Sequence, residues 1–399
     1  MKILIIEGSL SPPVFIRSLM EGLLAHGVAV GLLGNYTPNG FNSSSPLFTR
    51  LITRYSKFNT LRLLLSCFVL CLVHNKAWRV AAGYVQNVDG MRLRLKHWRT
   101  HALILVYEPD VIHFQWAAHI EFYEPLIRAK HIKTVLSLRG RHINVTPHVV
   151  PSLKQLYADL FPQISGFHAV SKAMATAAIQ HGAPAGRIRV IHSFVPSDFI
   201  KAYRNEPFGG INGSLKIVSV GRFHWQKGYT DAVLAMRKLK DKNIKFSYTI
   251  VSSGKIPTEI LYLLKQLDLA AEVEIIPGVP HAEMPTLMTK FSILLLPSLE
   301  EGIANVVLEA MAVGLPVLST RCGGMAEVIE HGVNGWLVPV RNPEAIATEL
   351  EYFSQQSIET ITLTREKAHQ TIVNNYVQEK SIPRFVDLYS SLNKGSWGV

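Results

Sequence analysis

The sequence of 399 residues contains few cysteines: Cys67, Cys71 and Cys322. Three cysteines cannot supply the disulfide framework of a small secreted domain, and no Cys/His spacing typical of a zinc site is present. This cysteine usage suits a reducing cytosol. A secretory signal is not expected either, because Glu7 and Glu21 interrupt the apolar character of residues 1–34.

Acidic residues are scarce in one part of the chain. The net charge is +12, and the entire excess lies within residues 1–200. Residues 50–99, which we call the basic region, contain a single acid, Asp89. They contain ten basic residues: Arg50, Arg54, Lys57, Arg62, Lys76, Arg79, Arg92, Arg94, Lys96 and Arg99. A basic segment of this kind favours an anionic partner.

The basic region contains an apolar run at residues 63–73. Its 11 residues are too few to span a bilayer, which takes about 20. Cationic flanks around an apolar helix are typical of a segment that lies at an anionic membrane surface. The alternative is a buried helix with a solvated basic rim. Nucleic acid is not expected, since no recognised nucleic-acid module accompanies the charge.

Apolar segments alternate with amphipathic ones in both halves of the chain, which predicts two parallel sheets, each with helices on both faces. The strands expected in the first half are residues 1–6, 28–33, either 102–107 or 111–114, 134–138, 167–170 and 189–191. Those expected in the second half are residues 216–220, 246–251, 273–276, 293–296 and 317–319. Residues 200–214 are polar and rich in glycine, and are typical of a linker. The predicted domains are therefore 1–200 and 214–377, with a C-terminal helix within 378–399 that packs back on the first domain.

Two carboxylates stand out after the predicted strand 293–296. Glu301 lies in the loop that follows this strand, and Glu309 lies in a predicted helix over residues 305–313. A helix N-terminus can hold phosphate groups, and nearby carboxylates can accept hydrogen bonds from sugar hydroxyls. The alternative is that Glu309 lies on a solvated helix face. Because its neighbours are apolar, we expect its carboxylate to find a partner instead.

Two cations follow the first predicted strand of the second half. Arg222 and Lys227 lie within the segment 220–228, at the carboxyl end of strand 216–220. Such a pair can clamp a diphosphate and stabilise the negative charge that develops on it as it leaves. Because surface cations are common, the pair alone is a weak indication of a diphosphate site. The acidic segment that follows it in the sequence strengthens this prediction.

Four segments resemble a known family when they are taken in order: 220–228, 277–279, 297–312 and 323–327. They are similar to the retaining GT-B glycosyltransferases of glycosyltransferase family four. The resemblance implies two Rossmann-like domains that face a central cleft. It also implies that residues 1–200 bind the acceptor and residues 214–377 bind a nucleotide-sugar donor.

The resemblance assigns roles to individual residues of the second domain. Arg222 and Lys227 would hold the donor diphosphate without a bound metal or other cofactor, and the sequence has no D-x-D pair to hold a metal. Glu309 would meet the ribose hydroxyls, and Glu301 the transferred sugar. Backbone groups would complete the donor site: Gly278 and Val279 at the nucleobase, and Gly302, Ile303, Ala304 and Asn305 beside the sugar.

The first domain resembles the family in fewer places. Residues 110–113 and 167–171 fit its segments, but Gly8 and Ser9 stand where many relatives have two glycines. Arg139 stands where many relatives have a histidine that approaches the donor sugar. An arginine does not act as a base at neutral pH, yet it can donate hydrogen bonds to a hydroxyl, a carboxylate or the leaving phosphate. Two nearby histidines are secondary candidates: His119 and His142.

The function expected from the sequence is that of a cytoplasmic, retaining glycosyltransferase, peripheral on the inner face of the membrane. Its acceptor would be a lipid-linked or cell-envelope glycan, as in exopolysaccharide, capsule or lipopolysaccharide synthesis. One alternative is a catalytically weak glycosyltransferase-like subunit that binds a nucleotide or scaffolds a partner. Another is a nucleotide-sugar epimerase on the same fold, which would need no membrane-directed acceptor domain.

Overall fold

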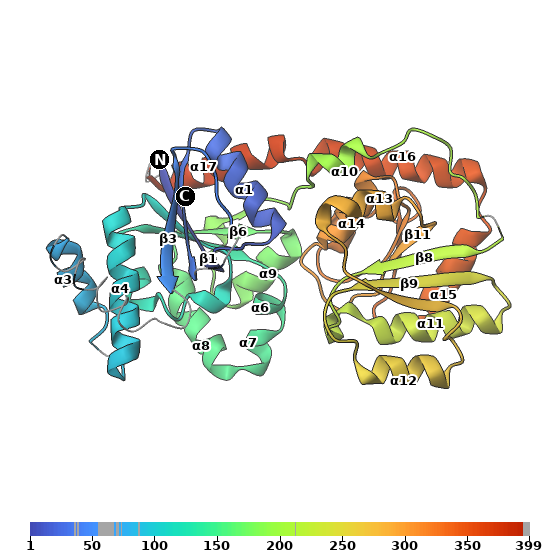
Figure 1. The fold of residues 1–399 in the computed structure, drawn as a ribbon, viewed down its shortest axis with the longest axis horizontal. Coiled ribbons are helices and arrows are strands. Elements are labelled where there is room, and N and C mark those ends of the chain that lie inside the picture. Colours follow the sequence, from blue (N-terminus) through green and yellow to red (C-terminus); the bar gives the residue numbers. More distant parts are fainter. Residues whose placement is uncertain are drawn as a thin grey trace. The chain divides into compact units, whose positions relative to one another are not determined.

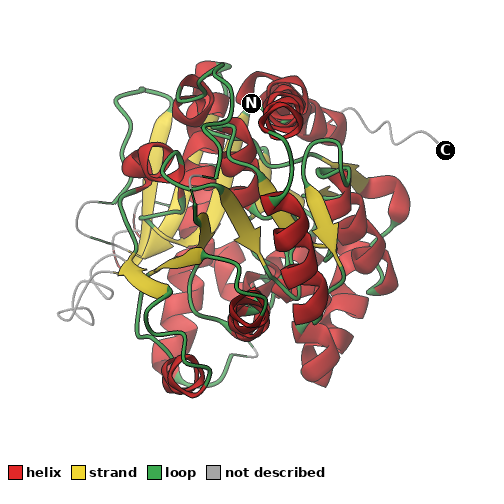
Figure 2. Cartoon of the chain, turned by 90° about the vertical axis from the view of Figure 1, so that its right-hand side faces the viewer, coloured by secondary structure: helices red, strands yellow, loops and turns green. Residues whose placement is uncertain are grey.

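The computed structural model describes residues 1–393 except for residues 36, 38–39, 55–67, 69–71, 73, 87 and 212. The chain divides into two compact units. Unit 1 contains Met1–Val170, Met174–Ile191 and the chain from Ile382 onward, and unit 2 contains Ser171–Ala173 and His192–Ser381. Helices and strands alternate along much of the chain in both units, as the sequence pattern predicts (Figure 1). Figure 2 distinguishes the helices from the strands by colour.

Unit 1 is built on a parallel seven-stranded sheet with the strand order β3-β2-β1-β4-β5-β6-β7. Its strands are β1 (Lys2–Ser9), β2 (Ala29–Asn35), β3 (Phe48–Arg54), β4 (Val111–Phe114), β5 (Lys133–Leu138), β6 (Gly166–Ala169) and β7 (Ile188–Val190). Of the two alternatives for the third predicted strand, residues 111–114 form it. Residues 102–107 instead end a helix. The edge strand β3 was not predicted.

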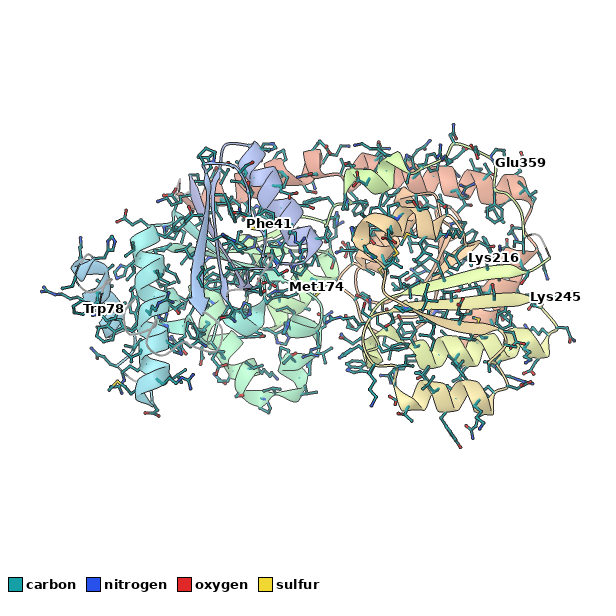
Figure 3. All side chains as sticks on the ribbon, in the orientation of Figure 1. Phe41, Trp78, Met174, Lys216, Lys245 and Glu359 are labelled. Carbon is teal, nitrogen blue, oxygen red and sulfur yellow. The ribbon has the colours of Figure 1, made fainter. Side chains whose placement is uncertain are left out.

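The helices in the first half of the chain connect these strands. They are α1 (Val14–Ala25), α3 (Asn75–Gly83), α4 (Met91–Tyr107), α5 (Glu124–Ala129), α6 (Arg141–Asn144), α7 (Thr146–Val149), α8 (Pro151–Leu160) and α9 (Lys172–Gln180). Short 3-10 turns add η1 (Ala117–His119), η2 (Phe161–Gln163) and η3 (Ala185–Arg187). Helix α3 packs on the outer side of α4 (Figure 1), where Trp78 stacks on Trp98 with a ring-centroid distance of 4.0 Å (Figure 3).

Unit 2 is built on a parallel six-stranded sheet with the order β10-β9-β8-β11-β12-β13. Its strands are β8 (Leu215–Val220), β9 (Phe246–Ser252), β10 (Val273–Pro277), β11 (Ile293–Leu296), β12 (Val317–Thr320) and β13 (Trp336–Val338). The edge strand β13 was not predicted, and the other five coincide with the expected segments to within one or two residues.

Helices cover both faces of the second sheet. One group comprises α11 (Tyr229–Asp241), α12 (Thr258–Gln266) and α15 (Pro343–Ser354). The other comprises α10 (Ser197–Lys201), α13 (Met284–Met288), α14 (Asn305–Ala312) and α16 (Ile358–Asn375). Three 3-10 turns, η4 (Trp225–Lys227), η5 (His281–Glu283) and η6 (Met325–Glu327), lie in the loops. Figure 1 shows α11 and α12 along one face of the sheet and α14 and α16 along the other.

Strand β11 shows why apolar runs form the centre of this sheet. The side chains of its four residues are at most 2% exposed. Ile293 and Leu295 belong to one core cluster, whereas Leu294 and Leu296 belong to the cluster on the opposite face. A strand that is covered on both faces must be apolar throughout, and each such side chain contributes about 1.5–3 kcal/mol on burial.

The division between the units lies between Ile191 and His192, rather than at residue 200. Val195 pairs with Val377, and the buried side chain of Phe199 belongs to a core cluster of unit 2. Residues 200–214 are not the open linker that their composition predicts. Phe208 is 8% exposed within the core of unit 2, and its N–H donates to the Thr362 hydroxyl at 2.9 Å.

The last helix of the described chain is α17 (Gln378–Asn393), and its part from Ile382 onward belongs to unit 1. Tyr389 is fully buried there and its hydroxyl contacts His113 Nδ1 at 2.7 Å. In the part of the chain that the structure describes, no helix has the length and apolar composition needed to cross a membrane.

The order of the strands predicts where ligands bind. In unit 1 the chain continues from the neighbouring strands β1 and β4 toward opposite edges of the sheet. In unit 2 it does the same from β8 and β11. Ligands of such sheets bind beyond the carboxyl ends of the strands at this point of divergence. Lys216 and Lys245 mark the amino ends of β8 and β9 (Figure 3), so the expected site of unit 2 lies at the other end of the sheet.

Candidate active site

The loops after β8 and β11 meet at the carboxyl end of the second sheet. Lys227 Nζ lies 2.7 Å from Glu301 Oε1, although the two residues are 74 positions apart. The Ser298 hydroxyl donates to the same carboxylate oxygen at 2.9 Å. The two segments come together because β8 and β11 are adjacent strands, so the fold brings a predicted cation and a predicted carboxylate into direct contact.

Glycine at position 228 makes this contact feasible. A Cβ atom on Gly228 would lie 2.0 Å from the Pro297 carbonyl oxygen, and its φ is +62°. The Leu299 N–H also donates to the Gln226 carbonyl at 2.7 Å, which holds the two loops together. Only a glycine tolerates this close backbone approach, so the two loops are held as one unit.

A third loop fixes Glu301 from the other side. A Cβ atom on Gly323 would lie 1.6 Å from the Glu301 carbonyl oxygen, and the Gly324 N–H donates to the Gly302 carbonyl at 2.8 Å. The Gly-Gly pair therefore packs backbone against backbone on the acidic loop. This segment was one of the four motifs of the resemblance, and in the folded protein it positions Glu301.

The N-terminus of α14 opens into the same loop. Its N-cap is Ala304, whose side chain makes no capping hydrogen bond, and the Ala304 N–H donates to the Met325 sulfur at 3.5 Å. Helices usually place Ser, Thr, Asp or Asn at this position to satisfy the first N–H groups. Ile303 and Ala304 are buried, whereas Asn305 is half-buried. The first turn of α14 can thus donate to oxygen atoms of a bound phosphate or sugar.

Glu309 has a polar partner, as expected for a carboxylate with apolar neighbours. Its carboxylate lies 2.9 Å from His281 Nε2, and its side chain is only 14% exposed. The hydrogen bond to Glu309 raises the pKa of the His281 imidazole above its usual 6.5, against the opposing effect of burial. His281 was not among the predicted residues, because the pairing depends on the loop after β10 lying beside α14.

The predicted nucleobase segment lies in that same loop after β10. The Gly278 N–H donates to the Ser252 carbonyl at 3.0 Å, and a Cβ atom at Gly278 would lie 2.1 Å from the Ser253 hydroxyl oxygen. Val279 packs against a core cluster. The predicted donor residues of unit 2 thus form two adjoining groups, one around Lys227 and Glu301 and one around Glu309. Arg222 lies in the β8 loop with its side chain exposed.

Glu327 has a role that its motif did not reveal. Its carboxylate accepts hydrogen bonds from the Lys172 N–H at 2.8 Å and the Ala173 N–H at 3.0 Å. It caps the first turn of α9, whose first two residues belong to unit 2, and an acid is favourable at that helix end. Glu327 therefore holds the backbone of Lys172 and Ala173, and its carboxylate also lies 3.5 Å from His192 Nε2.

The residues Gly8 and Ser9, which were predicted to lie in a loop, instead form the carboxyl end of β1. Glu7 accepts a hydrogen bond from the Ser9 N–H at 2.8 Å, and burial raises the pKa of its carboxyl group. A Cβ atom on Gly8 would lie 3.1 Å from the His119 imidazole, so the glycine admits that ring. Burial lowers the pKa of His119 and of His142. Burial therefore disfavours the charged form of both imidazoles.

A pocket of about 180 Å³ lies beside this end of β1. Its floor is formed by β1, β2 and the aromatic ring of Phe122, and its polar lining includes Asn35, Lys96, Thr100 and His119. Lys96 Nζ stands 5.4 Å from the centre of the Phe122 ring. A hollow of this size, with an apolar floor and a few polar groups, suits a single ring-sized ligand.

Arg139 follows β5 at the same edge of the first sheet. One guanidinium nitrogen donates to Gln115 Oε1 at 3.3 Å, and the guanidinium carbon stands 4.5 Å from the centre of the Phe15 ring. Arg139 belongs to unit 1, whereas the predicted donor residues Lys227, Glu301 and Glu309 belong to unit 2.

A buried polar chain runs through the centre of unit 1 and was not predicted. His113 Nε2 and His168 Nδ1 both contact the Ser137 hydroxyl at 2.8 Å, while His113 Nδ1 contacts the Tyr389 hydroxyl. His168 Nε2 contacts the Ile191 carbonyl at 2.8 Å. Burial holds the pKa of His113 well below its usual value. These histidines are satisfied structural groups that link three strands to α17.

Known proteins resemble this chain in sequence. Residues 205–378 match the family described as glycosyl transferases group 1. This part of the chain is thus similar to that family. The chain is 29% identical to the amylovoran biosynthesis glycosyltransferase AmsK of Erwinia amylovora over 286 residues, and this alignment covers 69% of each protein. It is 33% identical to the putative colanic acid biosynthesis glycosyltransferase WcaL of Escherichia coli, over 41% of this chain and 42% of that one.

Solved structures of glycosyltransferases share the fold. A glycosyltransferase from Rickettsia africae aligns over 99% of both chains with a TM-score of 0.71 and 18% identity. Anabaena Alr3699/HepE, solved in complex with UDP and glucose, aligns over 98% of this chain and all of that one, with a TM-score of 0.69 and 18% identity. The chain thus has the GT-B architecture of two Rossmann-like domains, as predicted. Its described residues contain no group of three or more His, Cys, Asp or Glu placed to hold a metal ion.

Proposed function

We propose that this protein is a glycosyltransferase that transfers a sugar from a nucleotide diphosphate sugar to a lipid-linked or cell-envelope glycan, with retention of the anomeric configuration. The observation that carries the proposal is the contact between Lys227 and Glu301 beside the open N-terminus of α14. A cation, a carboxylate and helix N–H groups are the three kinds of group that a sugar diphosphate needs.

The relatives support the classes of donor and acceptor. Alr3699/HepE was solved with UDP and with UDP-glucose. The relatives AmsK and WcaL are named for the biosynthesis of amylovoran and of colanic acid, the latter as a putative assignment. We therefore assign a nucleotide-sugar donor to unit 2 and an exopolysaccharide, capsule or lipopolysaccharide precursor to unit 1.

In the proposed reaction an acceptor hydroxyl oxygen forms the bond to the anomeric carbon of the donor sugar. The bond from that carbon to the diphosphate oxygen breaks, and the departing diphosphate takes the hydroxyl proton on the same face. Lys227 and Arg222 stabilise the negative charge that accumulates on the diphosphate. Because the leaving group accepts the proton, the reaction requires no general base at Arg139. Glu301 would orient the sugar hydroxyls through its carboxylate.

Within this proposal Glu309 accepts hydrogen bonds from the ribose hydroxyls, in exchange for or together with its contact to His281. The backbone of Gly278 and Val279 lies at the nucleobase. The 180 Å³ pocket beside Gly8 and Ser9 receives a ring of the acceptor. Arg139 donates to an oxygen atom at the same edge of unit 1.

The basic region provides the proposed contact with an anionic membrane on the inner, cytoplasmic side. Much of the apolar run 63–73 lies outside the described residues, but Phe68 and Leu72 are described and are 62% and 66% exposed. Met91 and Leu93 are 70% and 47% exposed on α4, among basic residues. Exposed apolar side chains next to cations favour attachment to an anionic lipid surface.

The stereochemical part of the proposal is tested on the product. Wild-type protein is incubated with a donor of known anomeric configuration, with and without EDTA, and the new linkage is identified by the proton coupling at its anomeric carbon. We expect the configuration of the donor and an unchanged rate in EDTA, since Arg222 and Lys227 take the place of a metal. An inverted linkage would refute retention, and loss of activity that added Mg²⁺ restores would refute metal independence.

A further inference from the structure

Unit 1 contains a cation that lacks an acidic partner at the edge where its ligands are expected. Arg139 follows directly on β5, beside Gln115 at the end of β4. None of the described carboxylates forms an ion pair with its guanidinium, and none contributes to the pKa of Arg139. Its contacts are the 3.3 Å hydrogen bond to Gln115 and the aromatic face of Phe15.

Arg139 and Gln115 each have a buried hydrogen-bond donor without an acceptor among the described residues. Arg139 Nε and Gln115 Nε2 have no hydrogen-bond partner in the described part of the chain. Gln115 itself is fully buried, whereas part of the Arg139 side chain reaches solvent. Native proteins seldom leave buried donors unpaired, and they seldom bury a cation without a counter-charge. The cost at Arg139 is reflected in its pKa, which burial lowers to about 10.

The geometry fits one class of ligand. A guanidinium presents a planar fork of donors that matches a carboxylate or phosphate, and the amide nitrogen of Gln115 adds a neutral donor beside it. The two residues lie next to the divergence of β1 and β4, where the fold places ligands. A purely structural arginine would be expected to satisfy its Nε within the protein.

We propose that Arg139 and Gln115 form an oxyanion-binding subsite that is completed by an acidic group on a substrate of this enzyme. The group is the carboxylate of an acidic sugar or a phosphate of the substrate. This proposal rests on the proposed function only for the statement that the anion belongs to a substrate. The subsite itself is a property of unit 1 and is measurable without any transfer reaction.

The test compares thermal unfolding midpoints of the full chain with three probes: sodium glucuronate, inorganic phosphate and neutral glucose, all at matched ionic strength. We expect glucuronate, phosphate or both to raise the midpoint of the wild type, and glucose to have no effect. A response to glucuronate alone identifies a carboxylated sugar, and a response to phosphate alone identifies a phosphorylated group. Equal midpoints with all three probes would overturn the subsite.

Two variants separate this subsite from others. Gln115→Glu places a carboxylate beside Arg139, so we expect it to raise the midpoint of the free protein and to abolish the anion response. Arg139→Gln removes the guanidinium, and should weaken anion binding about 10- to 100-fold, as expected for loss of a charge-assisted hydrogen bond. Phosphate that binds near Lys227 in unit 2 would still bind after both substitutions. Only the part of the midpoint increase that the substitutions remove therefore supports the subsite.

The control is Arg189→Gln, which removes an exposed arginine of β7. It should leave the anion response unchanged. An undiminished response in both Arg139→Gln and Gln115→Glu would refute the proposal, even if sugar transfer by the wild type is established. Conversely, an anion response that depends on Arg139 would stand even if no transfer were found, so the two proposals fail separately.

Discussion

At the scale of single residues, the pairing of Glu309 with His281 shows how a predicted donor group is held before a ligand arrives. The carboxylate lies on a helix with apolar neighbours, and the imidazole supplies the compensating contact at 2.9 Å. Since Glu309 raises the pKa of His281, the charged pair is more stable in the folded protein than its separated groups are in the unfolded one.

This pairing predicts a pH dependence of stability. A histidine with a raised folded-state pKa stabilises the fold fully below its unfolded pKa of about 6.5, and this contribution is lost as the pH rises through the higher folded value. We therefore expect the unfolding midpoint of wild type to fall across this window relative to that of Glu309→Gln. Thermal unfolding of both proteins across a pH series measures the difference. Parallel curves would contradict the pairing.

Lys227 predicts a catalytic effect at the same scale. Lys227→Met retains the aliphatic stem but removes the charge that would stabilise the leaving diphosphate. We expect kcat to fall about 10²- to 10³-fold, the range found when one stabilising donor is removed. Arg237→Met, which breaks an exposed ion pair with Asp241 on α11, is the matched control and should keep full activity. Equal rates for the two variants would exclude Lys227 from the reaction.

At the scale of elements, loops that touch through glycine backbones hold the candidate donor site together. In Gly323→Ala the new methyl group would collide with the Glu301 carbonyl, and the residue would be held at φ +48°. Gly332 provides a control with a similar φ of +76° but with no atom within 4 Å of the added methyl group. The comparison isolates the backbone contact from the cost of the left-handed conformation.

We expect Gly332→Ala to cost about 1 kcal/mol of unfolding free energy and to leave nucleotide binding intact. Gly323→Ala should cost more, about 2–4 kcal/mol, because the loop must shift as well. It should also weaken UDP or GDP binding, since the shift displaces Glu301. Chemical denaturation and calorimetry measure both quantities. Unaltered nucleotide affinity in a folded Gly323→Ala would show that this loop does not position the donor site.

Helices α3 and α4 carry the prediction about the membrane. Three exposed cations of these helices are Lys76, Arg79 and Arg92. Each contributes about 1 kcal/mol near an anionic surface, so their joint replacement by Glu should weaken binding to phosphatidylserine vesicles more than about 100-fold. Three exposed lysines elsewhere, replaced together by Glu, form the charge-matched control: Lys154, Lys245 and Lys265. Vesicle sedimentation that fails to distinguish the two triple variants would exclude this surface.

At the scale of the whole molecule, the sequence predicted the central strands and the order of the donor motifs. Strands such as Ile293–Leu296 are buried on both faces, so their apolar runs are unmistakable. The edge strands Phe48–Arg54 and Trp336–Val338 escaped prediction because one is partly polar and the other is three residues long. Residues 102–107 are apolar but belong to a helix, which a short apolar run cannot exclude.

The site was predictable where it depends on a motif and unpredictable where it depends on the packing of distant segments. Lys227 and Glu301 were both singled out from the sequence, and adjacent strands bring them into contact. The pairing of His281 with Glu309 needs the loop after β10 to lie beside α14, and no local pattern encodes this. The same holds for the unpaired donors of Arg139 and Gln115, which only the folded unit reveals.

The measurement that tests the proposed function most directly is nucleotide release from UDP-, GDP- and ADP-sugars, with detergent-solubilised membrane extract as the source of acceptor. Wild type and Glu309→Ala are compared, with and without the extract. We expect release from one class of donor that requires the extract and falls sharply in Glu309→Ala. Binding of a donor without release under any of these conditions would contradict a transferase and favour a subunit that only binds the nucleotide.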